Sequence, residues 1–165
     1  MRWPGVPQAI SFTQHDHADC ADDVLKRAEK IALSKGLRLT EVRRRVLEIL
    51  AEEHRALGAY EVLDRLNAEG YGSQPPVAYR ALDFLVTHGL AHRIRRLNAF
   101  AACTRPAENH APVFLICASC QKVAELSGTA AANSLRQEAK ALGFSIERMS
   151  LEAAGTCPAC EKDNS

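Results

Sequence analysis

Apolar residues recur every three or four positions over four stretches in the first part of the chain, which is the spacing of amphipathic helices. In the first stretch, Val24, Ala28 and Ile31 share one face, and Thr40 is a candidate N-cap for the second. The four helices are predicted to begin at residue 22, after Thr40, at about residue 59 and at Pro75. A proline fits the start of the fourth because the first N–H groups of a helix have no partner within it.

Two short strand patterns follow these helices. Residues 91–95 and 99–103 are predicted to pair around a turn at Arg96 to Asn98. Short helices followed by a two-stranded hairpin have the element order of a winged helix-turn-helix, which we predict for residues 22–104. Residues 1–21 are expected to form a flexible N-terminal tail.

The last third of the chain mixes strand and helix patterns. After a hinge at residues 105–112, strands are expected at 113–117, 123–126 and 144–151. A helix is expected at 129–142, with one face inward that consists of Ala131, Leu135, Ala139 and Leu142. The predicted fold class is therefore α+β, with a small α/β domain at residues 113–165. Because this domain is too small for a large core, a metal ion and dimerisation would support it.

Composition and charge exclude several classes of protein. The chain has 165 residues, of which 47% are hydrophobic, and its net charge is +1. Wholesale disorder and a globally basic coat protein are both excluded. It contains no apolar run long enough to span a membrane, and the first ten residues lack the apolar core of a signal peptide. We therefore expect a cytoplasmic protein.

The charge is unevenly distributed along the chain. Residues 24–98 carry 14 basic and nine acidic side chains, a net charge of +5, whereas residues 1–23 carry −3 and residues 99–165 carry −1. The positive charge thus coincides with the predicted winged helix-turn-helix, which favours DNA as its partner.

Four of the six cysteines form two pairs of identical spacing, Cys117 with Cys120 and Cys157 with Cys160. Two such pairs supply four thiolates, the donor set of a closed tetrahedral zinc site. The alternatives are two redox motifs or free buried thiols. Neither pair has the strand-then-helix context of a redox motif, so the pattern favours a structural zinc ion.

A second group of potential ligands lies near the hinge and consists of His92, Cys103, His110 and Glu125. One thiolate and one carboxylate balance the charge of Zn²⁺, which lowers the cost of burying the site. Since the four come from the hairpin, the hinge and the second domain, a bound ion would fix the orientation of the domains. The alternative is that each plays a separate structural role, as single buried His and Cys residues often do.

The N-terminal tail contains His15, His17 and Cys20, whose spacing suits a weak additional metal site. The alternative interpretation is a disordered tail with incidental ligands.

Several motifs resemble the ferric uptake regulator family, and most of all its zinc-responsive branch. They are Leu39-Thr40, Tyr60, the run from Pro75 to Leu85 that contains Tyr79-Arg80, and the first cysteine pair. The resemblance implies a homodimer with an N-terminal winged helix and a C-terminal dimerisation domain. It also implies repression of zinc-uptake genes through palindromic operators. By position, the two groups of four ligands match the structural and the regulatory zinc site, which makes two zinc ions per subunit.

The resemblance also implies which side chains meet DNA. Arg80 is expected to contact base edges, because it lies near the N-terminal end of the predicted recognition helix. Tyr79, Tyr60 and Arg43 are further candidate contacts. In the family, a residue matching Asp64 links neighbouring dimers on DNA, but here the partner position holds Asn67.

Alternatives of other classes remain open. An iron, manganese or peroxide sensor of the same family would share these motifs, and a zinc chaperone would share the cysteine pairs without a recognition helix. We predict no enzymatic activity and no catalytic residues, since the sequence contains neither a phosphate-binding glycine loop nor a positioned triad.

Overall fold

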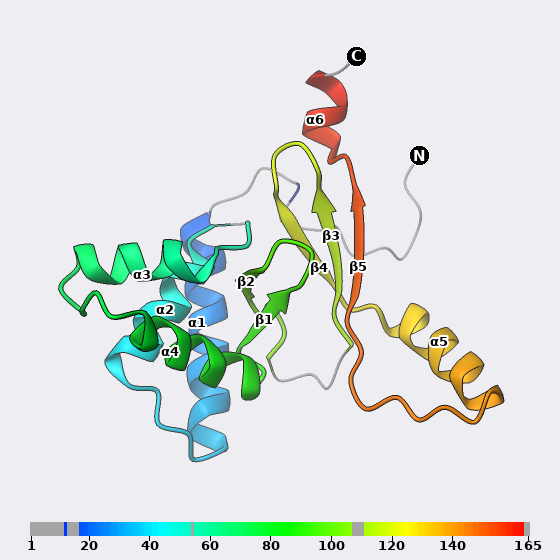
Figure 1. Cartoon of the computed structure of the whole chain (residues 1–165), viewed down its shortest axis with the longest axis horizontal. Coiled ribbons are helices and arrows are strands. Elements are labelled where there is room, and N and C mark those ends of the chain that lie inside the picture. The colour runs from blue at the N-terminus through cyan, green and yellow to red at the C-terminus, as the bar shows by residue number, and fades with distance from the viewer. Residues whose placement is uncertain (1–11, 13–16, 54, 107–110, 164–165) are drawn as a thin grey trace. The chain divides into compact units, whose positions relative to one another are not determined.

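The computed structural model of the chain describes residues 12, 17–53, 55–106 and 111–163, with the backbone alone for residues 17–20. It separates into two compact units, one within residues 15–108 and one within residues 109–165, to which Phe12 also belongs. The first is mainly helical and the second contains a three-stranded sheet (Figure 1), so the predicted α+β class is confirmed. None of the described helices is long and apolar enough to cross a membrane.

The N-terminal unit has the predicted order of elements. Its helices and strands are α1 His17–Ser34, α2 Glu41–Ala51, α3 Ala59–Ala68, α4 Pro75–Thr87, β1 Ala91–Ile94 and β2 Ala99–Ala102. β1 and β2 pair antiparallel, and an isolated bridge joins Leu57 to Phe100. The start of α1 was predicted five residues too late, at Asp22. Residues 17–21 carry no apolar repeat, so only the structure shows that this part of the predicted tail is helical.

Local chemistry explains where these helices begin. The Thr40 side chain accepts a hydrogen bond from the Arg43 backbone N–H at 3.5 Å, as an N-cap of α2. Before α3, the Gly58 N–H donates to the Glu61 carboxylate at 2.9 Å. Pro75 occupies the first position of α4, whose N-cap is Gln74. Each device satisfies or removes a backbone donor that the helix itself cannot pair.

The core of this unit lies between α2, α3, α4 and the hairpin. It contains fully buried aliphatic side chains from each of them, including Leu47, Leu50, Val62, Leu66, Leu82, Leu85 and Ala91. Burying one Leu side chain contributes about 1.5–3 kcal/mol relative to leaving it exposed. Packing of these aliphatic side chains therefore fixes α4 against α2 and α3.

Ion pairs connect α2, α3 and the turn between them at the surface. Arg45 contacts three carboxylates, those of Glu48, Glu52 and Glu69. Arg55 pairs with Glu53 and Glu61, and Arg65 pairs with Glu52 and Glu53. The guanidinium of Arg45 donates to Glu69 and lowers the pKa of that carboxyl group. Five glutamates of this unit are therefore neutralised by neighbours within it.

The C-terminal unit is built on a sheet of strand order β4-β3-β5. Its elements are β3 Val113–Cys117, β4 Val123–Leu126, α5 Thr129–Ala141, β5 Leu151–Gly155 and α6 Pro158–Asp163. β4 runs antiparallel to β3, whereas β5 runs parallel to it and is reached through α5. At the start of α5, Gly128 has φ of 59°, and an added Cβ would collide with Val113 and lie 2.8 Å from the Ala111 carbonyl oxygen. Only glycine fits this close approach.

Two predictions for this unit are wrong. The expected strand at residues 144–151 is irregular up to Ser150, and β5 begins only at Leu151. The alternating side chains Phe144 and Ile146 line a hollow beside Leu135 of α5 instead of joining the sheet. The small residues of β5 gave little strand signal.

The predicted inward face of α5 is wrong in part. Ala139 is buried as predicted, together with Ala132, whereas Ala131 is exposed, Leu135 is 40% exposed and Leu142 is 85% exposed. The exposed leucines and Phe144 leave an apolar surface on this unit, in the chain taken alone.

The core packing makes a testable prediction. Leu82→Ala is expected to lower the free energy of unfolding by about 2–5 kcal/mol, because it opens a cavity at a fully buried position of α4. Leu33→Ala is the matched control, since Leu33 is 84% exposed on α1, and its effect should stay within about 0.5 kcal/mol. Urea denaturation followed by far-ultraviolet circular dichroism measures both. Equal effects of the two substitutions would contradict this placement of α4.

Candidate metal centre and nucleic-acid-binding surface

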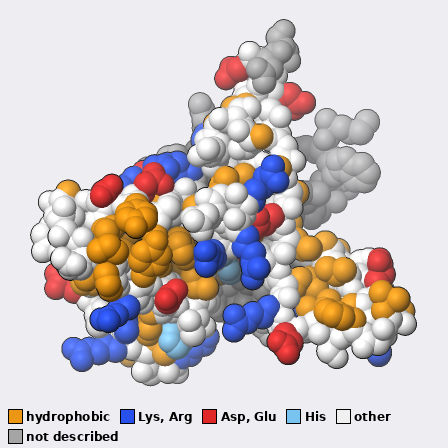
Figure 2. Space-filling view, viewed as in Figure 1, with side chains coloured by type: hydrophobic (Ala, Val, Ile, Leu, Met, Phe, Trp, Pro, Cys, Tyr) orange, Lys and Arg blue, Asp and Glu red, His pale blue; other side chains and the backbone are white. Residues whose placement is uncertain are grey.

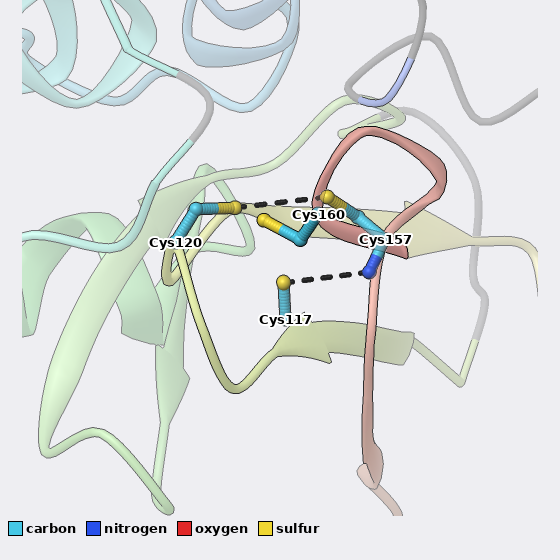
Figure 3. Close-up of side chains that lie close together, drawn as sticks. All are labelled: Cys117, Cys120, Cys157 and Cys160. Carbon is cyan, nitrogen blue, oxygen red and sulfur yellow. Dashed lines mark hydrogen bonds between the residues drawn. The ribbon is translucent and has the colours of Figure 1, made fainter. Parts of the chain in front are cut away.

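The fold brings the two cysteine pairs together. Cys117 ends β3 and Cys120 lies in the turn that follows, while Cys157 and Cys160 lie at the start of α6 (Figure 3). The parallel register pairs Cys117 with Gly155, so the chain reaches Cys157 two residues beyond that point. The Ala118 N–H donates to the Gly155 carbonyl oxygen at 2.8 Å and closes this end of the sheet. Sequence spacing had predicted the cluster, and strand pairing explains it.

The geometry of the cluster fits a tetrahedral metal ion. All four sulfur atoms lie within 4.8 Å of one another, and Cys120 Sγ is 3.7 Å from Cys157 Sγ. Zinc bonded to four sulfurs at about 2.3 Å would set them about 3.8 Å apart. The described cysteines form no disulfide, which leaves all four thiols available. The donor set and its spacing therefore match a structural zinc site.

Hydrogen bonds favour the thiolate form of one of these cysteines, Cys117. Backbone N–H groups of Cys120 and Cys157 donate to Cys117 Sγ and lower the pKa of that thiol to about 6. Hydrogen bonds with the neighbouring cysteines raise the pKa of Cys160 to about 12. Without a metal ion, four adjacent thiols cannot all ionise, and a dication removes that conflict.

The second predicted ligand group is distributed over both units. His92 is in the middle of β1 and Cys103 directly follows β2, and their ligand atoms lie within 4.8 Å of one another. Cys103 is buried, and its N–H donates to the Leu90 carbonyl oxygen at 3.0 Å. Glu125 is half-buried on β4 of the C-terminal unit, opposite Phe114. His110 lies outside the described residues.

The predicted tail site consists of residues at and before the start of α1. His15 lies outside the described residues. His17 and Cys20 belong to the first turns of α1, where only the backbone is described.

Three predicted DNA contacts are exposed on the N-terminal unit. Tyr79 and Arg80 are exposed near the start of α4, and Tyr60 of α3 is 65% exposed. The rings of Tyr60 and Tyr79 meet edge to face, with centroids 6.5 Å apart. Figure 2 shows hydrophobic side chains gathered over α3 and α4 on this unit. Exposed aromatic rings beside an arginine suit contact with base edges and with the sugar–phosphate backbone.

The fourth predicted contact, Arg43, has a different environment. Its guanidinium lies over the ring of Phe84 and donates to the Arg38 carbonyl oxygen. The Arg43 guanidinium therefore already has partners within the N-terminal unit, whereas Arg80 is exposed.

Comparisons with known proteins agree with this geometry. The sequence model described as the ferric uptake regulator family matches residues 34–154. The zinc uptake regulation protein of Escherichia coli strain K12 is 33% identical over 141 residues, which cover 84% of this chain and 81% of that protein.

Two solved structures are similar over most of the chain. One is a zinc uptake regulator complexed with zinc and DNA, with a TM-score of 0.82 and 31% identity, covering 87% of this chain and 97% of that one. The other is the holo crystal structure of XcZur, with a TM-score of 0.77 and 37% identity, covering 84% of this chain and 96% of that one.

The cysteine cluster makes a second prediction. Cys117→Ser is expected to lose about one equivalent of tightly bound zinc and to lower the melting temperature, because three thiolates hold the ion less well and the end of the sheet loosens. Ser119→Ala is the matched control, since this exposed residue lies between the two cysteines and carries no thiol. Mass spectrometry of metals and thermal denaturation measure the two effects. If Cys117→Ser retained the zinc content and melting temperature of the wild type, the cluster would not be a structural metal site.

Proposed function

Because the chain belongs to the ferric uptake regulator family, we propose that it is a zinc-dependent transcriptional repressor that binds palindromic operators of zinc-uptake genes as a homodimer. The observation that carries this proposal is the pair of His92 and Cys103 at the hairpin, whose ligand atoms lie within 4.8 Å of one another. Soft and borderline donors in the DNA-binding unit itself favour zinc as the effector and a regulator as the function. A zinc chaperone needs no such ligands beside a recognition helix.

Two zinc ions per subunit follow from the two ligand groups. The structural ion would be held by Cys117, Cys120, Cys157 and Cys160. The regulatory ion would be held by His92, Cys103, His110 and Glu125. Bound there, zinc supplies a positive charge that draws the thiolate, the carboxylate and the imidazoles together.

The distribution of the regulatory ligands supports a sensing role. His92 and Cys103 belong to the N-terminal unit and Glu125 to the C-terminal unit, with His110 in the predicted hinge. A single ion held by all four would restrict the orientation of the units. This would favour one spacing of the two recognition helices in a dimer, and thereby one spacing of operator half-sites.

Operator recognition rests on the exposed surface of α3 and α4. Arg80 would donate two hydrogen bonds to a guanine base, which is worth about 1–3 kcal/mol of discrimination. Tyr79 and Tyr60 would contact phosphates or thymine methyl groups. These contacts combine sequence readout by Arg80 with positioning by the two rings.

The homodimer would form through the C-terminal unit. Leu135, Leu142 and Phe144 are exposed there in the single chain. A group of exposed large apolar side chains is typical of a surface that a partner subunit covers. Two dimers on one operator would use Asp64 on α3 as their candidate contact, although the matching partner position holds Asn67. We place the protein in the cytoplasm, where its DNA target lies.

The proposal is tested by binding to DNA at buffered concentrations of free metal. The probe is a palindromic duplex selected with the zinc-loaded protein from a random DNA library. Zinc should raise affinity by about 5- to 150-fold, the usual range of allosteric coupling. Cys103→Ser should abolish this dependence while retaining the zinc of the cysteine cluster.

The alternatives give different results in the same assay. A stronger response to Fe²⁺ or Mn²⁺ than to Zn²⁺ would indicate another sensor of the family. Zinc binding without preference for any duplex would favour the chaperone. An unchanged zinc response in Cys103→Ser would overturn the regulatory ligand set.

A further inference from the structure

Arg43 connects the start of α2 to the end of α4. Its Cζ atom lies 3.6 Å from the centroid of the Phe84 ring, within the range of a cation–π contact. Its Nη1 donates to the Arg38 carbonyl oxygen at 2.8 Å. The residue as a whole is half-buried, while its guanidinium hydrogen bond is exposed, so the ring contact is of the kind found near a protein surface.

Phe84 lies on the same side of α4 as the base-contacting candidate. Arg80, Phe84 and His88 are spaced by four residues, which places them in one row along the helix and its C-cap. The His88 ring packs against Phe84 at 4.5 Å between centroids, with 57° between the planes. Phe84 is therefore held by Arg43 from another helix and by His88 from its own end.

The position of Arg43 in α2 is unfavourable by local criteria. A cation in the first turn of a helix opposes the helix dipole. Phe84, by contrast, is in the last turn of α4, where a positive charge is favourable. Contact with another helix therefore accounts for an arginine at this position better than the propensity of α2 does.

The contact with Arg43 adds to the packing that limits rotation of α4 about its axis. Leu82 and Leu85 fix its buried face, while the other two buried side chains, Ala78 and Ala81, bring the helices close but offer little surface to resist rotation. The Arg43 guanidinium over the Phe84 ring opposes rotation of α4 from outside its buried face. Rotation of α4 would move Arg80, one turn away from Phe84.

We propose that Arg43 is a positioning residue for DNA recognition, which aims Arg80 by holding Phe84 and makes no phosphate contact of its own. The inference rests on the proposed function, since it assumes that α4 reads DNA. It replaces the sequence-based expectation that Arg43 touches the operator.

The test compares the wild type and four variants on two probes. The variants are Arg43→Met, Phe84→Leu, the double variant and Arg44→Met, all loaded with zinc. Arg44→Met is the matched control, because it removes the same charge from the same turn of α2, and Arg44 pairs with Glu29 and Glu48 instead of an aromatic ring. The probes are the selected palindrome and a duplex of random sequence, each titrated over a range of salt concentrations.

A positioning role predicts a loss of discrimination. Arg43→Met should weaken binding to the palindrome about tenfold relative to Arg44→Met, with equal affinities of these two variants for the random duplex. Phe84→Leu should cause a similar loss, and the double variant should be no weaker than the single ones, because both remove one interaction. The salt dependence should be the same for Arg43→Met and Arg44→Met. A purely structural role would lower the melting temperature without changing discrimination.

Other outcomes would overturn the proposal. A phosphate contact by Arg43 would weaken binding to both probes and reduce the salt slope by about 0.9 relative to Arg44→Met. Full operator affinity of Phe84→Leu would also exclude the positioning role, and this variant remains informative if Arg43→Met does not fold. If the wild type preferred no duplex over another, the proposed function itself would fail, and the positioning role with it.

Discussion

The pairing of β5 with β3 is the constraint on which the C-terminal unit depends. It brings residues far apart in sequence to one end of the sheet, where the register of Cys117 with Gly155 sets the four thiols side by side. The unit buries few large side chains among its described residues, with Phe114 and Ile116 the main ones. Strand pairing and metal ligation thus support one another, because the sheet positions the sulfurs and an ion held by them would fix the last strand.

In the N-terminal unit, ion pairs decide where the positive charge is exposed. Glu48, Glu52, Glu53, Glu61 and Glu69 are paired with arginines of α2, α3 and the turn between them. Each surface pair adds little stability, about 0–1 kcal/mol. Their larger effect is on the surface potential. The paired glutamates do not offset arginines outside these pairs, such as Arg80, so those arginines keep their positive potential for a negatively charged partner.

Elements with strong local signals could be predicted from the sequence. Thr40 and Pro75 marked the starts of α2 and α4, and β3 and β4 have the predicted bounds because their alternating or apolar runs are bordered by turns. The cysteine cluster was equally predictable, since the spacing within each pair suffices to identify it.

Features that depend on contacts between distant parts of the chain could not be predicted from the sequence. Residues 144–150 alternate like a strand but pack beside α5, and β5 is built of small residues whose pairing depends on β3. Arg43 resembled a surface cation, because no sequence pattern reveals that Phe84 lies under it.

The crossover from β3 through α5 to β5 also separates the two cysteine pairs in time during synthesis. The first pair follows β3, whereas the second pair is made only after α5 and β5. Because domains form as the chain is synthesised from its N-terminus, the N-terminal unit is complete before the second pair of thiols exists. In that interval Cys117 and Cys120 lack their two partner thiols, so competing metals and oxidants have access to an incomplete set of ligands.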